Sequence, residues 1–109
     1  MSKIRESARN EECTIRIPGT CNFDSSTTVL MHANGSAAGK GLGMKSPDIL
    51  GAYGCSACHA VVDRMVPLPK HLTRDDVRLM FYEGHARTVL RLIEKGLIEM
   101  ERGKVKVTA

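Results

Sequence analysis

Four cysteines fall into two pairs, and the second pair runs directly into a histidine. Cys13 stands eight residues before Cys21, and Cys55 and Cys58 lie in the run Cys-Ser-Ala-Cys-His. A Cys-x-x-Cys spacing places two thiolates about one helical turn apart, close enough to bind one zinc ion, and a second pair can complete a four-thiolate tetrahedron. Four thiolates leave no open coordination position. The spacing therefore predicts a structural Zn²⁺, and any reaction must come from other residues.

Three residues beside the cysteines could carry such a reaction. His59 follows Cys58 directly and so faces away from it on a helix, whereas Asp63 lies four residues further and shares the face of His59. An imidazole and a carboxylate on one face can bind a divalent cation. His32 ends a β-branched run and could lie alongside. A cation that binds the phosphate oxygens and an imidazole that takes a proton from water suffice for phosphodiester hydrolysis.

Each of these features also has a plain structural explanation. The zinc could be a scaffold with no enzyme behind it, His32 an ordinary half-buried residue, and His59 a support for the zinc. Asp63 and Arg64 could form a solvated surface pair. An even number of cysteines also permits disulfides. Haem attachment through Cys-x-x-Cys-His and a thiol redox role are disfavoured, because a second cysteine pair is present and no thioredoxin-like βαβ pattern is visible.

Composition favours the metal. The chain has 109 residues, of which 42% are hydrophobic but only 4% aromatic. Residues 18–54 are mostly small or polar, so this half needs a metal or another cross-link to be stable. The first residues are polar and no apolar stretch is long enough to span a membrane, so we expect a cytoplasmic protein of the host cell, in which cysteines bind metal rather than pair. The net charge of +4 suits an anionic partner such as DNA without requiring one.

The periodicity of the chain predicts the elements that position these residues. Residues 1–12 suit a short helix or an arm. Alternation over residues 13–17 predicts a strand that ends in a turn at Pro18 and Gly19, and residues 26–32 predict a second strand that ends at His32. Residues 56–65 suit a helix.

The second half is predicted to be helical and then to form a hairpin. Thr73 is a helix cap followed by acidic residues, and helical spacing continues past a possible break at Gly84 to a C-cap at Lys95 and Gly96. Residues 97–100 and 104–107 alternate across a turn, which predicts a terminal hairpin.

A glycine-rich loop over residues 33–47 separates the second strand from the cysteine pair. Lys40 and Lys45 in this loop, together with Arg64 after the cysteines, could contact a nucleic-acid phosphate. The Gly-x-x-x-x-Gly-Lys-Ser/Thr pattern of nucleotide-binding loops is absent, so a nucleotide site is not predicted.

Four stretches of the chain resemble one known family. They are residues 9–22, 28–32, 47–50 and 57–64, and the resemblance extends weakly through 83–89 and 95–98. They are similar to the YbcO-like family of small phage and prophage proteins, which are assigned as HNH-like (ββα-metal) nucleases. The resemblance covers roughly residues 5–65.

The resemblance implies roles for particular residues. It makes His32 the general base at the end of the first strand, and His59 and Asp63 the ligands of a catalytic divalent ion. Met31 stands where such families commonly carry a further ligand. The middle Asn of the HNH pattern has no clear counterpart. Asp48 lies in the right region as a tentative ligand, and Asn34 is a possible orienter of the base.

Together these observations predict an α+β fold with a zinc-stapled ββα-metal (HNH/treble-clef-like) core. We expect a single domain over residues 1–109, with an N-terminal arm (1–12), the core (13–66) and a helical extension with a possible hairpin (72–109). The expected function is a phage-encoded, metal-dependent DNA endonuclease with Mg²⁺, Mn²⁺ or Zn²⁺ as catalytic ion and a separate structural Zn²⁺. The alternative is a non-catalytic zinc module that binds DNA or a protein, for which the winged-helix-like end of the chain is the best support.

Overall fold

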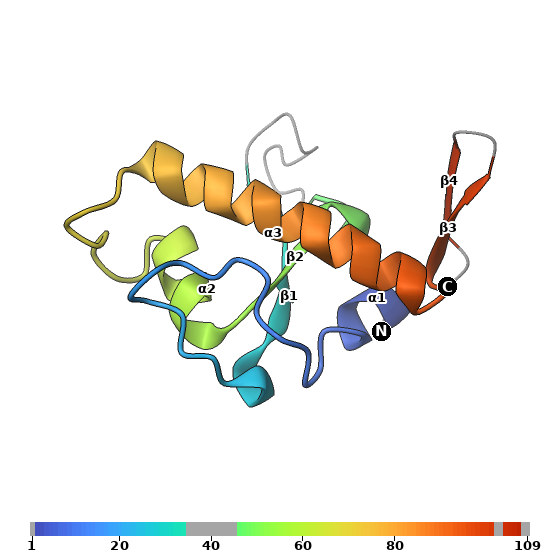
Figure 1. Cartoon of the computed structure of the whole chain (residues 1–109), viewed down its shortest axis with the longest axis horizontal. Helices are drawn as coiled ribbons and strands as arrows, with labels where there is room; N and C mark the ends of the chain where they lie inside the picture. Colours follow the sequence, from blue (N-terminus) through green and yellow to red (C-terminus); the bar gives the residue numbers. More distant parts are fainter. Residues whose placement is uncertain (1, 35–45, 102–103, 108–109) are drawn as a thin grey trace.

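The computed structural model describes residues 2–34, 46–101 and 104–107 (Figure 1). Its helices and strands, in chain order, are α1 (Lys3–Glu6), β1 (Val29–Met31), β2 (Ala52–Gly54), α2 (Ser56–Val62), α3 (Arg74–Glu94), β3 (Ile98–Glu101) and β4 (Lys104–Val107). Two 3₁₀ turns, η1 (Ser25–Thr27) and η3 (Asp48–Leu50), precede β1 and β2. The predicted α+β class is confirmed, and the long α3 lies across the rest of the chain.

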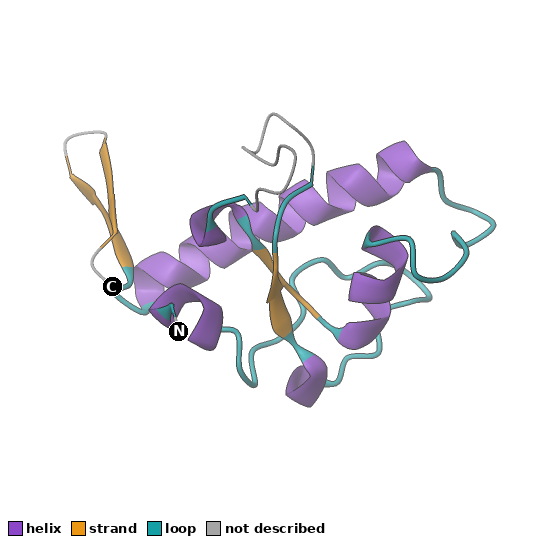
Figure 2. Ribbon diagram, turned by 180° about the vertical axis from the view of Figure 1, so that it is seen from behind, coloured by secondary structure: helices purple, strands orange, loops and turns teal. Residues whose placement is uncertain are grey.

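β1 and β2 form an antiparallel pair that is followed at once by α2 (Figure 2). Val29 lies opposite Gly54, and Met31 lies opposite Ala52. The predicted strand over residues 26–32 is therefore shorter than expected, because Asp24 caps a 3₁₀ turn through its side chain before the extended backbone begins. β1 ends at Met31, one residue before the predicted end at His32.

The predicted strand over residues 13–17 is wrong. Arg16 has a φ of 56°, which an extended strand does not allow. Instead the segment lies beside the outer edge of β2, where the N–H of Thr14 donates to the carbonyl of Tyr53 at 2.9 Å. The predicted turn at Pro18 and Gly19 is present: Gly19 has a φ of 73°, and the N–H of Cys21 donates to the carbonyl of Ile17 at 2.9 Å.

α3 begins at the predicted cap. Thr73 accepts from the N–H of Asp76, and the Asp76 carboxylate accepts from the N–H of Thr73, which completes a capping box. The helix runs through Gly84 without the possible break. Glycine is needed at this position because the helix packs closely on Ile15: a Cβ on Gly84 would lie 3.0 Å from the Cα of Ile15. The helix ends before Gly96, whose φ of 72° suits the predicted C-cap.

Buried side chains form two clusters, one on each side of β1. The cysteine-side cluster includes Met31, Ala33 and the buried cysteines, together with Val77 and Phe81 of α3. The α1-side cluster has the members Ile4, Ala8, Leu30, Tyr53, Leu92 and Ile98. The segment expected as an arm therefore contributes two buried residues, and α3 packs against both clusters.

The remaining elements agree with the sequence. α2 begins at Ser56 as predicted and ends three residues earlier than expected, at Val62. β3 and β4 pair as the predicted terminal hairpin. Among the residues that the structure describes, no helix is long and apolar enough to cross a membrane.

Candidate metal centre and histidine–carboxylate pairs

The four cysteines converge on one point. Cys13 and Cys21 flank the loop beside β2, whereas Cys55 caps α2 and Cys58 lies in its first turn. Their four sulfur atoms all lie within 4.8 Å of one another. A zinc tetrahedron with Zn–S bonds of about 2.3 Å has S···S edges of about 3.8 Å. The Sγ atoms of Cys21 and Cys55 are 3.8 Å apart, so the cluster fits a metal ion such as zinc.

The alternative disulfides are not formed. All four cysteines are free thiols, and the 3.8 Å between the Sγ atoms of Cys21 and Cys55 far exceeds a bonded S–S distance of about 2.05 Å. Cys55 and Cys58 are fully buried and Cys13 almost so, whereas Cys21 is half-buried. Such a closed set of donors suits a structural ion.

Crowding of the thiols shifts their pKa values in opposite directions. A hydrogen bond from Cys58 lowers the pKa of Cys13 to about 4, and the same contact, together with burial, raises the pKa of Cys58. Burial raises the pKa of Cys21 to about 11. Without a cation one thiolate is therefore favoured at the expense of its neighbours. A divalent ion removes this conflict, because it stabilises every thiolate at once.

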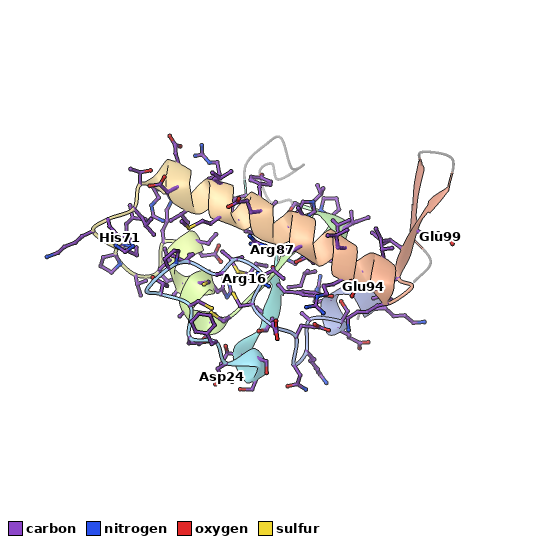
Figure 3. The ribbon with its side chains drawn as sticks, in the orientation of Figure 1. Arg16, Asp24, His71, Arg87, Glu94 and Glu99 are labelled. Atoms are coloured by element: carbon purple, nitrogen blue, oxygen red, sulfur yellow. The ribbon has the colours of Figure 1, made fainter. Side chains whose placement is uncertain are left out.

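Two guanidinium groups hold the segment that carries Cys13. The Nε of Arg16 donates to the carbonyl of Cys13 at 3.3 Å, and the Nη1 of Arg87 on α3 donates to the carbonyl of Thr14 at 2.7 Å. Both labelled arginines lie in the middle of the molecule, under α3 (Figure 3). A Zn²⁺ ion with four thiolates carries two net negative charges, and these cations partly offset them.

On the other side of β1, His32 belongs to a chain of polar contacts. Its Nε2 lies 2.6 Å from Oδ1 of Asp48, and the same oxygen accepts from Nη2 of Arg5 at 3.1 Å. Burial opposes the ionisation of Asp48, but hydrogen bonds from His32, Ser2 and Arg5 outweigh it and lower its pKa to about 2. Asp48 is thus a carboxylate at neutral pH. The Nε2 of His32 must donate to it, and in the neutral imidazole the lone pair is then on Nδ1.

The second pair is on α2, as predicted. His59 and Asp63 share a face, and their Nε2 and Oδ2 atoms are 2.7 Å apart. Both side chains are more than one-third exposed, at 36% and 37%. Arg64 follows with a φ of 60° and is exposed. An imidazole and a carboxylate open to solvent can hold a divalent ion with water in its other positions.

The structure brings His32 to Asp48 and His59 to Asp63, but it does not bring the two pairs into one group of ligands. Within the described part of the chain, the four cysteines form the one group of three or more Cys, His, Asp or Glu residues whose ligand atoms lie within 4.8 Å. Alternation along β1 explains the separation. Met31 and Ala33 point to the cysteine-side cluster, whereas Leu30 points to the α1-side cluster. His32, two residues after Leu30, contacts Asp48, which in turn contacts Arg5 of α1.

Other predicted residues have different outcomes. Asp48, expected as a tentative ligand, lies against the imidazole of His32, whereas Asn34 is exposed beyond His32. Lys40 and Lys45 lie outside the described residues. Sequence reasoning assigned no role to Arg5, because the 43 residues that separate it from Asp48 hide the contact.

The sequence also predicts no role for His85. Its Nδ1 lies 2.8 Å from the carbonyl of Gly51, so Nδ1 carries the proton and α3 is tied to the residue before β2. No spacing signal in the sequence pointed to this bond, since 34 residues separate the two partners.

Comparison with known proteins gives the same picture of the family. A family model described as "Putative nuclease YbcO" matches residues 2–97. The chain belongs to the YbcO family. Two curated YbcO relatives, one from Escherichia coli (strain K12) and one from Enterobacteria phage 82, are each 36% identical over 99 residues, covering 91% of this chain and 99% of the relative; both are named as putative nucleases.

A solved structure resembles the fold as well. It is described as a putative bacteriophage protein from Escherichia coli, is 34% identical to this chain and superposes with a TM-score of 0.68. The similarity covers 86% of this chain and all of that one. The expected membership of a phage and prophage family of YbcO proteins is thus confirmed.

Proposed function

We propose that this chain is a metal-dependent endonuclease that hydrolyses phosphodiester bonds of DNA, built on an HNH-like ββα-metal core. The observation that carries the proposal is the contact of His32 with Asp48, in a chain whose relatives are named nucleases. Antiparallel strands followed directly by a helix support the ββα-metal assignment.

His32 acts as the general base in this proposal. Asp48 holds the imidazole by its Nε2–H, so the lone pair on Nδ1 takes the proton of the attacking water. The imidazolium that forms is stabilised by the Asp48 carboxylate at 2.6 Å. Arg5 keeps that carboxylate in place from α1, and its half-exposed guanidinium leaves donors for a phosphate oxygen.

A divalent ion completes the proposal. His59 and Asp63 are its candidate ligands, and Asp48 is the alternative because it already lies against His32. Bound Mg²⁺, Mn²⁺ or Zn²⁺ would supply charge stabilisation at the leaving oxygen. The four cysteines hold a separate, structural Zn²⁺ that positions α2 against the loop of residues 13–21.

The test is a cleavage assay on supercoiled and linear DNA with millimolar Mg²⁺ or Mn²⁺. His32→Ala should lower the rate by about 10²–10⁴ because the base is lost, while zinc content stays unchanged and the melting temperature falls only by the loss of the hydrogen bond to Asp48. His71→Ala is the matched control, since His71 is an exposed histidine in the loop before α3 (Figure 3). Cleavage by His32→Ala at the rate of wild type would refute the base.

The same assay distinguishes the two candidate positions of the divalent ion. Asp63→Asn should raise the ion concentration needed for half-maximal cleavage if α2 holds the ion, whereas Asp48→Asn should do so if the ion lies beside His32. A rate that depends on no divalent ion would refute the metal dependence.

One observation favours the alternative, a zinc module without catalysis. In the described part of the chain His32 with Asp48, and His59 with Asp63, form separate pairs rather than one group of ligands. Zinc-loaded protein that binds DNA but cuts no form of it under the conditions above would establish this function in place of the nuclease.

A further inference from the structure

A cleft lies between α1 and β1, next to the pair of His32 and Asp48. Its volume is about 220 Å³, and it is lined by Arg5, Glu6 and Arg9 on one side and by residues 28–30 on the other. β1 pairs only with β2 among the described strands, so its other edge is left to this cleft.

The lining of the cleft is mostly apolar, and its positive charge comes from Arg5 and Arg9. Arg9 is exposed, and its guanidinium has no ion pair or hydrogen bond within the described residues. Arg5 uses Nη2 for Asp48 and is about half exposed, at 47% of its side chain. The hydroxyl of Thr28 is buried and has no partner among the described residues. Glu6 is the single carboxylate of the lining.

These groups match the chemistry of a phosphodiester. Guanidinium forks bind phosphate oxygens with two parallel hydrogen bonds, and contacts of this kind fix the register of a protein on nucleic acid. The cleft also starts one side chain away from the proposed base, because Asp48 Oδ1 contacts both Arg5 and His32. We propose that the cleft binds a backbone phosphate of DNA next to the phosphate that is cut; this position rests on the proposed function.

The experiment measures binding apart from cleavage. The affinity of zinc-loaded full chain for a labelled DNA duplex is followed by fluorescence anisotropy over a range of salt, in EDTA-free buffer without Mg²⁺ or Mn²⁺. Arg9→Ala should weaken binding about 3- to 10-fold and lower the slope of log K against log salt by about 1, since each phosphate contact contributes about 0.9. Arg9→Lys should keep most of the slope.

Two further variants make the test specific. Glu6→Gln should tighten binding, because it removes the carboxylate that repels the phosphate. Arg78→Ala is the control for loss of an exposed positive charge. Arg78 pairs with Asp75 near the start of α3, and this end of the helix lies at the other end of the molecule from α1 (Figure 1). Arg78→Ala should leave the slope nearly unchanged.

The outcomes separate this inference from the nuclease proposal. Equal losses of slope in Arg9→Ala and Arg78→Ala, no loss in either, or a loss seen with RNA but not DNA would overturn the cleft. A wild-type protein that binds no DNA would overturn it too. Arg9-dependent binding without any cleavage would leave the cleft standing and the nuclease refuted. Normal binding and normal cleavage by Arg9→Ala would refute the cleft and leave the nuclease proposal standing.

Discussion

The two sides of β1 carry different kinds of site. On the cysteine side four ligands meet in a closed, mostly buried cluster, and neighbouring carbonyls are satisfied by Arg16 and Arg87. On the α1 side a half-buried imidazole, a carboxylate and a half-exposed arginine adjoin an open cleft. A closed site can stabilise a fold but admits no substrate, whereas a reacting group must stay reachable. Chemistry is therefore expected on the α1 side.

The charges of the two sides differ in the same way. Burial raises the pKa of Cys21 to about 11, so these thiols need an added cation before all of them ionise. The pKa of Asp48 is already lowered to about 2, because its partners His32 and Arg5 come from the chain itself. The thiols of the cysteine side need a metal to ionise together, whereas the charge of Asp48 is already stabilised by groups of the chain. Each variant below tests one side of this contrast.

The largest effect is expected on the cysteine side. Cys58→Ser removes one of the four proposed zinc ligands from the first turn of α2, and structural zinc contributes on the order of 10 kcal/mol to small zinc domains. We expect loss of bound zinc and loss of the cooperative melt, measured by elemental analysis and circular dichroism.

The neighbouring Ser56→Ala is the control for that variant, since Ser56 is exposed on the same turn of helix and its hydroxyl accepts one exposed hydrogen bond, from Asn22. It should keep its zinc and melt close to wild type. A folded, zinc-free wild-type protein would contradict the role of the cluster.

Local signals predicted the cysteine side well. The Cys-x-x-Cys spacing and the helix start at Ser56 are short-range features, so the cluster and α2 followed from the sequence. The strand assigned to residues 13–17 failed because Arg16 adopts a left-handed backbone that alternation cannot reveal. Its segment is held instead by tertiary bonds to Tyr53 and Arg87.

The α1 side was harder to predict. His32 was predicted from its place at a strand end. Its partner Asp48 lies 16 residues after it, and Arg5 lies 43 residues before Asp48. Neither distance has a periodic signature. A sequence can thus indicate a candidate base without indicating which residues surround it.

A smaller loss is expected where α3 joins β2. Thr88 accepts from the N–H of Tyr53 at 3.0 Å and donates to the carbonyl of Gly84 at 2.9 Å, and it is fully buried. Thr88→Val keeps the shape but leaves the Tyr53 N–H without a partner, which costs about 2–3 kcal/mol. Urea unfolding should show this loss.

Thr88→Ser retains the hydroxyl and should lose less, about 1 kcal/mol for the buried methyl group. The variant separates the hydrogen bonds from packing. If Thr88→Ser were the more damaging change, packing rather than the bond to Tyr53 would hold α3 on the sheet.

The smallest effect is expected from Asp48, and its sign depends on pH. The pKa of Asp48 falls from 3.8 in the unfolded chain to about 2 in the fold, so its contribution is fully present above pH 4 and is lost as pH falls toward 2. The shift corresponds to at most about 2.5 kcal/mol. Asp48→Asn should thus be less stable than wild type at pH 7 by up to that amount, and the difference should shrink below pH 4.

Acid also protonates the cysteines, so zinc content must be measured at every pH and only the difference between the two proteins is interpreted. Asp75→Asn is the control, because Asp75 is an exposed carboxylate of α3, with 88% of its side chain open to solvent. It should leave stability nearly unchanged at every pH. A gap between Asp48→Asn and wild type that widened on acidification would reverse the sign required by a lowered pKa. In that case the carboxylate would not be held by His32 and Arg5, and the contrast between the two sides of β1 would lose its electrostatic basis.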